Sequence, residues 1–355
     1  MASVVAVALA LSAGCAAEER AGQKTPPTVD RLFAHIGDFP LGAPTSRFDY
    51  QSLDLDAQRL YIAKMAAGTL LAVDIARNAL VAELEGFPKV TGVLVVPELH
   101  KVYASVPGAG LVPSVEVALG MIGLSSGRGA IVVLDTLHLH EIARLPGGVF
   151  PDGIAYDPAD RRIFVSDELG SAVLMVDADA DRVVAVVKPG GEVGNVQYDT
   201  VTRKVFAALQ SRDQLVAIDP ADGRIAARYA LSGCEHPHGL ALAPTSGVGY
   251  VACDGNDRLL AIDLATGRVL GRWPLAHDPD VLAIDRRAGR LYVAAESGSL
   301  SSFDIRDAGH PRPLGDVFVG DGAHSVAVDS ATHRLYFPLA ARNGRPVLRV
   351  LAPKS

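Results

Sequence analysis

The sequence predicts an all-β fold, a seven-bladed β-propeller of four-stranded antiparallel blades. The first observation is a repeat of an aromatic residue preceded by an apolar one, with spacings of 42, 61, 42, 44, 42 and 44 residues. These aromatic anchors are Tyr61, Tyr103, Phe164, Phe206, Tyr250, Tyr292 and Tyr336. A period near 42 residues is typical of propeller blades. The second observation is that strand-length apolar runs alternate with Asp, Gly and Pro turns without helical periodicity, which indicates antiparallel strands.

The two ends of the sequence predict how the ring closes. The seventh copy supplies only three strands, around SVAVD, RLYFPL and PVLRVL, whereas RLFAHIG at residues 31–37 precedes the first copy and belongs to none. Because an open ring would expose an edge strand, we expect residues 31–37 to complete the last blade. A single propeller is therefore expected over residues 31–355.

Six of the seven copies also contain an apolar run that ends in aspartate, usually twelve or thirteen residues after the aromatic anchor, and the seventh ends without it. These aspartates are Asp74, Asp135, Asp177, Asp219, Asp263 and Asp304, of which Asp135 comes later in its copy than the others. A short carboxylate at this place can accept bonds from backbone groups of its own turn. We therefore expect them to stabilise hairpins rather than to perform chemistry.

The composition and the first residues suggest where the protein works. The net charge of −7 is spread over the chain without a basic stripe, which disfavours a nucleic-acid partner. Residues 1–15, MASVVAVALALSAGC, form a short apolar run that is typical of an export signal, and residues 16–30 have the composition of a flexible tether. No later apolar run is long enough to span a membrane.

Two resemblances follow from these motifs. The first fifteen residues resemble a bacterial lipoprotein signal, which implies lipidation of Cys15 and a lipid anchor on the periplasmic face of the envelope; an ordinary cleaved signal is the alternative. The repeats RLYIA, KVYAS, RIFVS and RLYVA resemble the YVTN-repeat, or YncE-like, group of bacterial propellers, within a wider set of lactonase-like propellers. That fold supports hydrolases, lyases, dehydrogenases and binding modules, so the resemblance implies the fold and leaves the activity open.

Candidate functional residues lie where the innermost strands are expected to begin, at one mouth of the central channel. Twelve residues before each aromatic anchor, the equivalent positions are Asp49, Thr91, Asp152, Gly194, His238, Asp280 and His324. The five Asp and His residues among them are candidate ligands of a zinc, manganese or calcium ion, or of a small molecule. His238, Asp280 and His324 are candidate catalytic acids and bases. The structural alternative is that these side chains bond only to water and to neighbouring blades.

Other polar residues are assigned by their expected face. Arg47, Asn195 and His236 are further candidate ligand-binding residues on loops at the same mouth. Lys64, Glu168, His277 and Glu296 lie on that face too. We expect these four residues, together with Arg47 and Asn195, to be mainly solvated. Five histidines fall in or near the opposite hairpins and are expected to be surface residues: His100, His138, His140, His310 and His333.

Two further features are predicted at this mouth. Cys234 precedes the inner strand of blade five and Cys253 ends the strand paired with it, so a disulfide is expected in an exported protein. An insertion over residues 107–129 is expected to lie over the mouth, with VPSVEVALGMIGL as a short helix forming a lid or pocket wall.

Three functions remain open from the sequence. The first is an exported envelope propeller that binds a small molecule, a divalent metal or both at the axial mouth. The second is a lactonase-like hydrolase or lyase that acts on a lactone or cyclic ester at that site. The third is a scaffold that binds another envelope protein and performs no chemistry.

Overall fold

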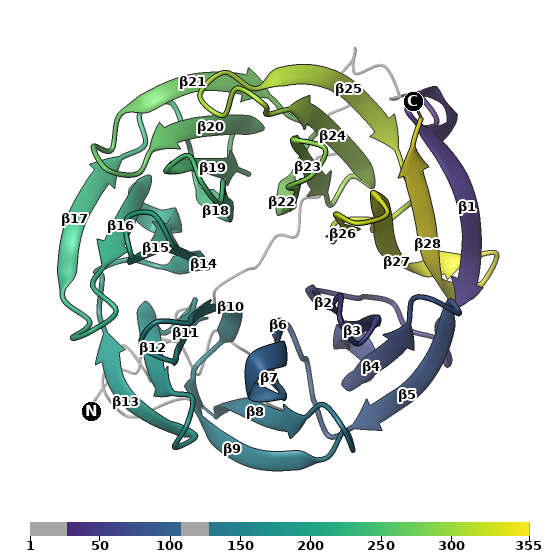
Figure 1. The fold of residues 1–355 in the computed structure, drawn as a ribbon, viewed down its shortest axis with the longest axis horizontal. Helices are drawn as coiled ribbons and strands as arrows, with labels where there is room; N and C mark the ends of the chain where they lie inside the picture. The colour runs from purple at the N-terminus through teal and green to yellow at the C-terminus, as the bar shows by residue number, and fades with distance from the viewer. Residues whose placement is uncertain (1–26, 108–127, 355) are drawn as a thin grey trace, which may run out of the picture.

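A computed structural model describes residues 27–107 and 128–354 of the chain. Figure 1 shows the strands arranged in seven sheets around a central axis. Each sheet has four antiparallel strands in consecutive order from the axis outwards, except the last, which has the order β26-β27-β28-β1. The predicted all-β, seven-bladed fold is confirmed.

The first four blades have the following strands. Blade one contains β2 (Gln51–Asp54), β3 (Arg59–Lys64), β4 (Thr69–Asp74) and β5 (Ala79–Glu85). Blade two contains β6 (Val93–Val96), β7 (Lys101–Val106), β8 (Gly129–Asp135) and β9 (Glu141–Gly148). Blade three contains β10 (Pro151–Asp157), β11 (Arg162–Asp167), β12 (Ala172–Asp177) and β13 (Arg182–Val187). Blade four contains β14 (Val193–Asp199), β15 (Lys204–Leu209), β16 (Gln214–Ile218) and β17 (Ile225–Ala230).

The remaining blades complete the ring. Blade five contains β18 (Pro237–Leu242), β19 (Val248–Cys253), β20 (Arg258–Asp263) and β21 (Val269–Pro274). Blade six contains β22 (Pro279–Asp285), β23 (Arg290–Ala295), β24 (Ser299–Asp304) and β25 (Arg312–Phe318). Blade seven contains β26 (Ala327–Asp329), β27 (Arg334–Arg342), β28 (Arg345–Pro353) and β1 (Phe33–Pro40). Within residues 27–107 and 128–354 there are also four short 3-10 helices: η1 (Val29–Arg31), η2 (Met65–Ala67), η3 (Pro97–Leu99) and η4 (Gln210–Arg212).

The aromatic anchors form the core of the ring. All seven lie on the second strand of their blade and are at most 1 % exposed. Tyr61 of blade one, for example, belongs to one apolar cluster with Val93 and Val102 of blade two. Such clusters between blades bury apolar surface at each contact around the ring, and this burial stabilises the closed circle.

The aspartates that end the third strands have the predicted structural role. Asp74 accepts a hydrogen bond from the backbone N–H of Arg77 at 2.9 Å. Asp263 accepts the N–H groups of Ala265 and Thr266 at 3.1 and 2.9 Å. Each carboxylate thereby satisfies backbone donors of its own hairpin turn.

The ring closes as the sequence predicts. Strand β1, purple in Figure 1, pairs antiparallel with the yellow strand β28, from Phe33 opposite Pro353 to Pro40 opposite Val347. Phe33 is buried in the cluster between blades six and seven. Arg349 donates to both carboxylate oxygens of Asp38 at 2.8 and 2.6 Å. The outer strand of the last blade is therefore held by apolar, ionic and backbone contacts together.

Several sequence-based expectations fall outside the described residues. The export signal at residues 1–15 with its lipidated Cys15, most of the tether at 16–30, and residues 108–127 of the insertion at 107–129 are among them. Within the described part of the chain, no helix has the length and apolar character needed to cross a membrane.

Candidate functional site

A polar cavity of about 420 Å³ opens at the mouth where the inner strands begin. Five of the seven predicted axial positions line it: Asp49, Thr91, Asp152, His238 and Asp280. The sixth, His324, is bonded to Asp280, and the seventh, Gly194, packs against the backbone of His238. Residues that are distant in the sequence thus meet at one axis.

A recurring irregularity places these side chains at the mouth. In β10, β14, β18 and β22 the pairing with the second strand shifts after the first residue of the strand. The residues in these shifts include Asp152, Gly194, His238 and Asp280. A bulge redirects the local side chain relative to the regular ladder, which explains why side chains at these strand starts face the cavity.

Close backbone contacts between neighbouring inner strands fix this geometry. A Cβ atom on Gly92 would lie 1.9 Å from the carbonyl oxygen of Asp152, and one on Gly239 would lie 2.0 Å from that of Asp280. Only glycine permits such approaches. The hydroxyl of Thr91 donates to the carbonyl of Pro151 at 2.8 Å. Thr91 therefore ties blade two to blade three.

Asp280 joins two histidines from the neighbouring blades. Its Oδ2 lies 2.7 Å from Nδ1 of His324 of blade seven, and its Oδ1 faces Nε2 of His238 of blade five at 3.4 Å. The other ring nitrogen of His324, Nε2, lies 3.1 Å from the carbonyl oxygen of Phe48 and so donates to it. That donor bond holds the His324 ring with Nδ1 turned towards the cavity carboxylates.

The charges of this group depend on one another. Burial alone would lower the pKa of His238, but the bond and charge of Asp280 raise it to about 10. The same balance raises the pKa of His324 to about 9. Burial opposes ionisation of Asp280, yet its pairing with His238 and His324 holds its pKa well below the ordinary value. These shifts favour the carboxylate form of Asp280 and the protonated forms of the two histidines.

Other acids surround this group. Oε1 of Glu296 lies 3.5 Å from Nδ1 of His324 and accepts a bond from Arg47 at 2.6 Å. Burial raises the pKa of Asp49 to about 7, and it also raises the pKa values of Asp152 and Glu168. The cavity thus contains carboxyl groups that a bound cation would keep ionised.

One cluster at this mouth could hold a metal ion. One ligand atom each from Asp280, Glu296 and His324 lies within 4.8 Å of the others. Two carboxylates and one imidazole suit zinc or manganese. Asp49, Asp152 and His238, the other predicted metal ligands, lie around the same cavity.

Two residues at the site were missed by the sequence analysis. The hydroxyl of Tyr50 lies 3.4 Å from Nε2 of His238 and accepts a bond from Asn195 at 3.3 Å. The side-chain amide of Gln210 lies 2.5 Å from Nδ1 of His238. Tyr50 was within reach of the same reasoning, because it follows Asp49 directly, whereas Gln210 lies in η4, after a second strand, where the repeat gives no position.

The residues expected on loops of this face have different surroundings. Arg47, Glu168, His236 and Glu296 line the cavity, and His236 pairs with Asp254 at 2.7 Å. His277 is exposed and pairs with Asp257 at 3.1 Å. These histidine pairs at the rim are not part of the Asp280 group.

The expectation that Lys64 and Asn195 are solvated is wrong. Lys64 is fully buried, where its ammonium group pairs with Glu83 at 2.6 Å. Asn195 is also buried, beside Tyr50. A buried ammonium group requires such an anion, and Glu83 comes from the outer strand β5, whose register the sequence analysis did not consider.

The predicted disulfide between Cys234 and Cys253 is confirmed, with a Cα–Cα separation of 5.3 Å. It joins the loop that carries His236 to the end of β19. Cross-linking residues 19 positions apart stabilises the fold by about 3 kcal/mol in the chain-entropy account. The bond also anchors one wall of the cavity.

Comparisons with known proteins extend these observations. Residues 211–311 match the family described as outer membrane protein assembly factor BamB, which is less than half of the chain. A search of curated proteins found no match.

Solved structures match over almost the whole chain. Hydrazine synthase of Kuenenia stuttgartiensis is 16 % identical, with a TM-score of 0.69 over 87 % of this chain and 97 % of that one. Streptogramin B lyase is 13 % identical, with a TM-score of 0.70 over 91 % and 99 %. The WD40 repeats of RRP9 are 8 % identical, with a TM-score of 0.73 over 93 % and 99 %. At these identities the likeness establishes the propeller fold alone.

Proposed function

We propose that this chain binds a divalent cation together with a small polar ligand at the axial mouth of the propeller. The observation that carries the proposal is the convergence of Asp280, Glu296 and His324, whose ligand atoms lie within 4.8 Å of one another. They come from the neighbouring blades six and seven, so the packing of these two blades brings them together.

The orientation of His324 supports a metal ligand. Histidines that bind metals usually donate their other ring N–H to a carboxylate or a backbone carbonyl, which fixes the tautomer. His324 donates from Nε2 to Phe48 and turns Nδ1 towards Asp280 and Glu296. Because calcium prefers oxygen ligands throughout, the imidazole favours manganese or zinc.

The rest of the cavity supports a polar organic ligand beside the cation. Arg47 and His238 offer donors, Asp49 offers an acceptor, and Tyr50 and Met65 provide apolar surface. Binding pockets commonly combine apolar walls with a few polar groups that fix orientation. A ligand with a carbonyl or carboxylate oxygen would bridge the cation and Arg47.

The cation proposal predicts a pH-dependent titration with manganese. The pKa of His324 is about 9, so at neutral pH a cation must displace one proton from Nδ1. Affinity for Mn²⁺ measured by isothermal titration calorimetry should therefore rise close to tenfold per pH unit between about pH 6 and 8. Glu296→Gln should lower the affinity at every pH.

Asp254→Asn is the matched control for this titration, because Asp254 is a carboxylate at the same cavity that pairs with His236 outside the cluster. Its affinity for Mn²⁺ should equal that of the native chain. Absence of Mn²⁺ binding between pH 6 and 8, or an equal loss in Asp254→Asn, would contradict the proposed cation site.

A second candidate function is a hydrolase or lyase that opens a lactone or another cyclic ester at this site. The observation that favours it is His238, which faces the cavity and has a pKa near 10, so that it holds a transferable proton at neutral pH. A cation at Asp280 would polarise a substrate carbonyl while His238 moves a proton. The likeness in fold to streptogramin B lyase makes streptogramin B a substrate to test.

For this second candidate, His238→Gln should reduce kcat at least about 100-fold on any lactone or cyclic ester that the manganese-loaded chain opens. The amide keeps a similar size but cannot exchange a proton. His277→Gln, at an exposed histidine that pairs with Asp257 and is not among the residues lining the cavity, should leave kcat within about twofold. Hydrolysis can be followed by proton release, and equal rates in the native and His238→Gln chains would reject the role of His238.

We also propose that the protein is exported to the bacterial envelope, with Cys15 lipidated, as a propeller of the YVTN-repeat type. The disulfide between Cys234 and Cys253 supports an oxidising compartment. The apolar residues 1–15 support export. A scaffold for another envelope protein stays the alternative if the axial variants change neither metal binding nor turnover.

A further inference from the structure

The hairpin between β8 and β9 differs in sequence from the same hairpin in other blades. It reads DTLHLH from Asp135, whereas the corresponding turns read DIARNA, DADADR, DPADGR and DLATGR. In those turns the fifth residue is Asn, Asp or Gly, which adopt positive φ readily, and the sixth is Ala or Arg. Blade two instead has Leu139 at a φ of 58° with a histidine on each side.

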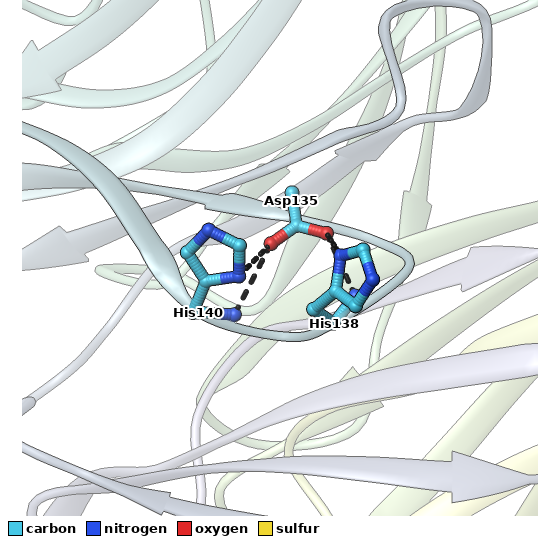
Figure 2. Close-up of side chains that lie close together, drawn as sticks. All are labelled: Asp135, His138 and His140. Atoms are coloured by element: carbon cyan, nitrogen blue, oxygen red, sulfur yellow. Dashed lines mark hydrogen bonds and ion pairs between the residues drawn. The ribbon is translucent and has the colours of Figure 1, made fainter.

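This backbone brings both histidines to the carboxylate of Asp135. Figure 2 shows the rings of His138 and His140 on either side of it. Nδ1 of His138 lies 3.3 Å from Oδ1, and Nδ1 of His140 lies 2.6 Å from Oδ2. The ring centroids are 5.7 Å apart, and one ligand atom from each of the three residues lies within 4.8 Å of the others.

The carboxylate is held in place by the backbone of its own turn. Oδ1 accepts the N–H groups of Leu137 at 3.0 Å and His138 at 2.7 Å, and Oδ2 accepts that of His140 at 3.3 Å. Such bonds orient a ligand before a metal arrives and reduce the ordering that binding requires. The two side chains are 75 % and 61 % exposed, so an ion from solvent can approach both rings.

We propose that Asp135, His138 and His140 form a zinc site on the β8–β9 hairpin, separate from the axial mouth. With metal–ligand bonds of about 2.0 to 2.1 Å, adjacent ligand atoms in a tetrahedral zinc site lie about 3.3 Å apart. Nδ1 of His138, 3.3 Å from Oδ1, already has this separation, whereas Nδ1 of His140, 2.6 Å from Oδ2, has to move outwards, which a rotation of its exposed ring allows. Three protein ligands leave the fourth position to water or to a donor from another molecule.

The ligand set decides the metal. Two imidazole nitrogens suit zinc and disfavour calcium and magnesium, which take oxygen ligands. The ligand set of this hairpin, two imidazoles and one carboxylate, also differs from that of the axial cluster, where two carboxylates and one imidazole converge. The two sites can therefore be tested independently, and this proposal does not rest on the axial one.

The experiment is a zinc titration measured by isothermal titration calorimetry. The chain carries no histidine tag, and Asp280→Asn weakens the axial cluster. One equivalent of Zn²⁺ should bind. His138→Gln and His140→Gln should each lower the affinity at least tenfold, and the double variant should lose the site. In the native chain, zinc should shift the imidazole NMR resonances of His138 and His140, which identifies the site without any axial substitution.

His310→Gln is the matched control. His310 is an exposed histidine 3.2 Å from Asp307 in the equivalent hairpin of blade six, with one imidazole beside one carboxylate. The His310→Gln variant should bind zinc with the same affinity as the chain that lacks this substitution. The proposal is overturned if the double variant of blade two keeps its zinc, or if His310→Gln loses as much affinity.

Discussion

Replacing Asp280 with alanine is expected to lower the free energy of unfolding by about 3 to 5 kcal/mol, the usual cost of removing one partner from a buried ion pair. The variant leaves His238 and His324 buried without the anion that stabilises their charged forms. Loss of that anion should lower the pKa of both rings. Urea denaturation followed by the fluorescence of the single tryptophan, Trp273, measures the change.

The same variant should remove a pH dependence of stability. The pKa values of His238 and His324 rise from an ordinary 6.5 to about 10 and about 9 in the folded chain. Since the folded state holds these protons more tightly, their contribution is complete below about pH 6.5 and is lost as pH rises through 9 and 10. The native chain should lose stability between pH 7 and 10, and Asp280→Ala should show much less of this loss.

Asp254→Asn provides the comparison, because Asp254 also pairs with a histidine, His236, but at the exposed rim of the cavity. Exposed pairs contribute about 0 to 1 kcal/mol, so this variant should unfold nearly as the native chain does. A loss in Asp280→Ala no larger than in Asp254→Asn, or an unchanged pH profile, would show that the group around Asp280 is not charged as described.

The fold was predictable because its determinants repeat. Tyr61, Tyr103 and the other anchors each fill the contact between two blades, so the same apolar position recurs every 42 to 44 residues except across the insertion. Closure was predictable for a related reason: the segment around Phe33 matched no blade, while the last blade needed a strand.

The site was predictable only in part. Counting back from the anchors found His238 and Asp280 because the inner strands share one bulge, which places equivalent residues at the mouth in several blades. Residues on loops do not lie at a fixed number of positions from the aromatic anchors. Gln210 reaches His238 from a 3-10 helix, and Glu296 reaches His324 from the turn after β23, at positions set by loop conformation rather than by the repeat.

The repeat pattern also did not predict which buried charged residues pair with each other. Lys64 carries a charge at the end of a strand, which normally indicates a solvated residue. Its environment depends on Glu83 from the outer strand of the same blade and on the carbonyl oxygen of Leu41, 3.5 Å from its ammonium nitrogen. Two-residue periodicity assigns a face to each side chain but does not say which distant acid meets it there.

Deleting β1 is expected to prevent stable folding. A chain that begins at residue 41 loses the strand paired with β28, the burial of Phe33 and the partner of the buried Arg349. Apolar burial of one phenylalanine contributes about 1.5 to 3 kcal/mol, and leaving a buried charge unpaired costs about 3 to 5 kcal/mol. Together with the lost ladder these approach the whole stability of a typical domain, about 5 to 15 kcal/mol.

The shortened chain should therefore aggregate through the exposed edge of β28, as size-exclusion chromatography would reveal. A chain that begins at residue 27 keeps β1 and should remain monodisperse to the same extent as the full chain. Within β1, Phe33→Ala should cost about 3 to 5 kcal/mol, whereas Ile36→Ala, at a side chain 43 % exposed, should cost under about 0.5 kcal/mol. If the chain lacking β1 unfolds at the same urea concentration as the full chain, blade seven is stable with three strands, and closure by the N-terminal segment does not hold the ring together.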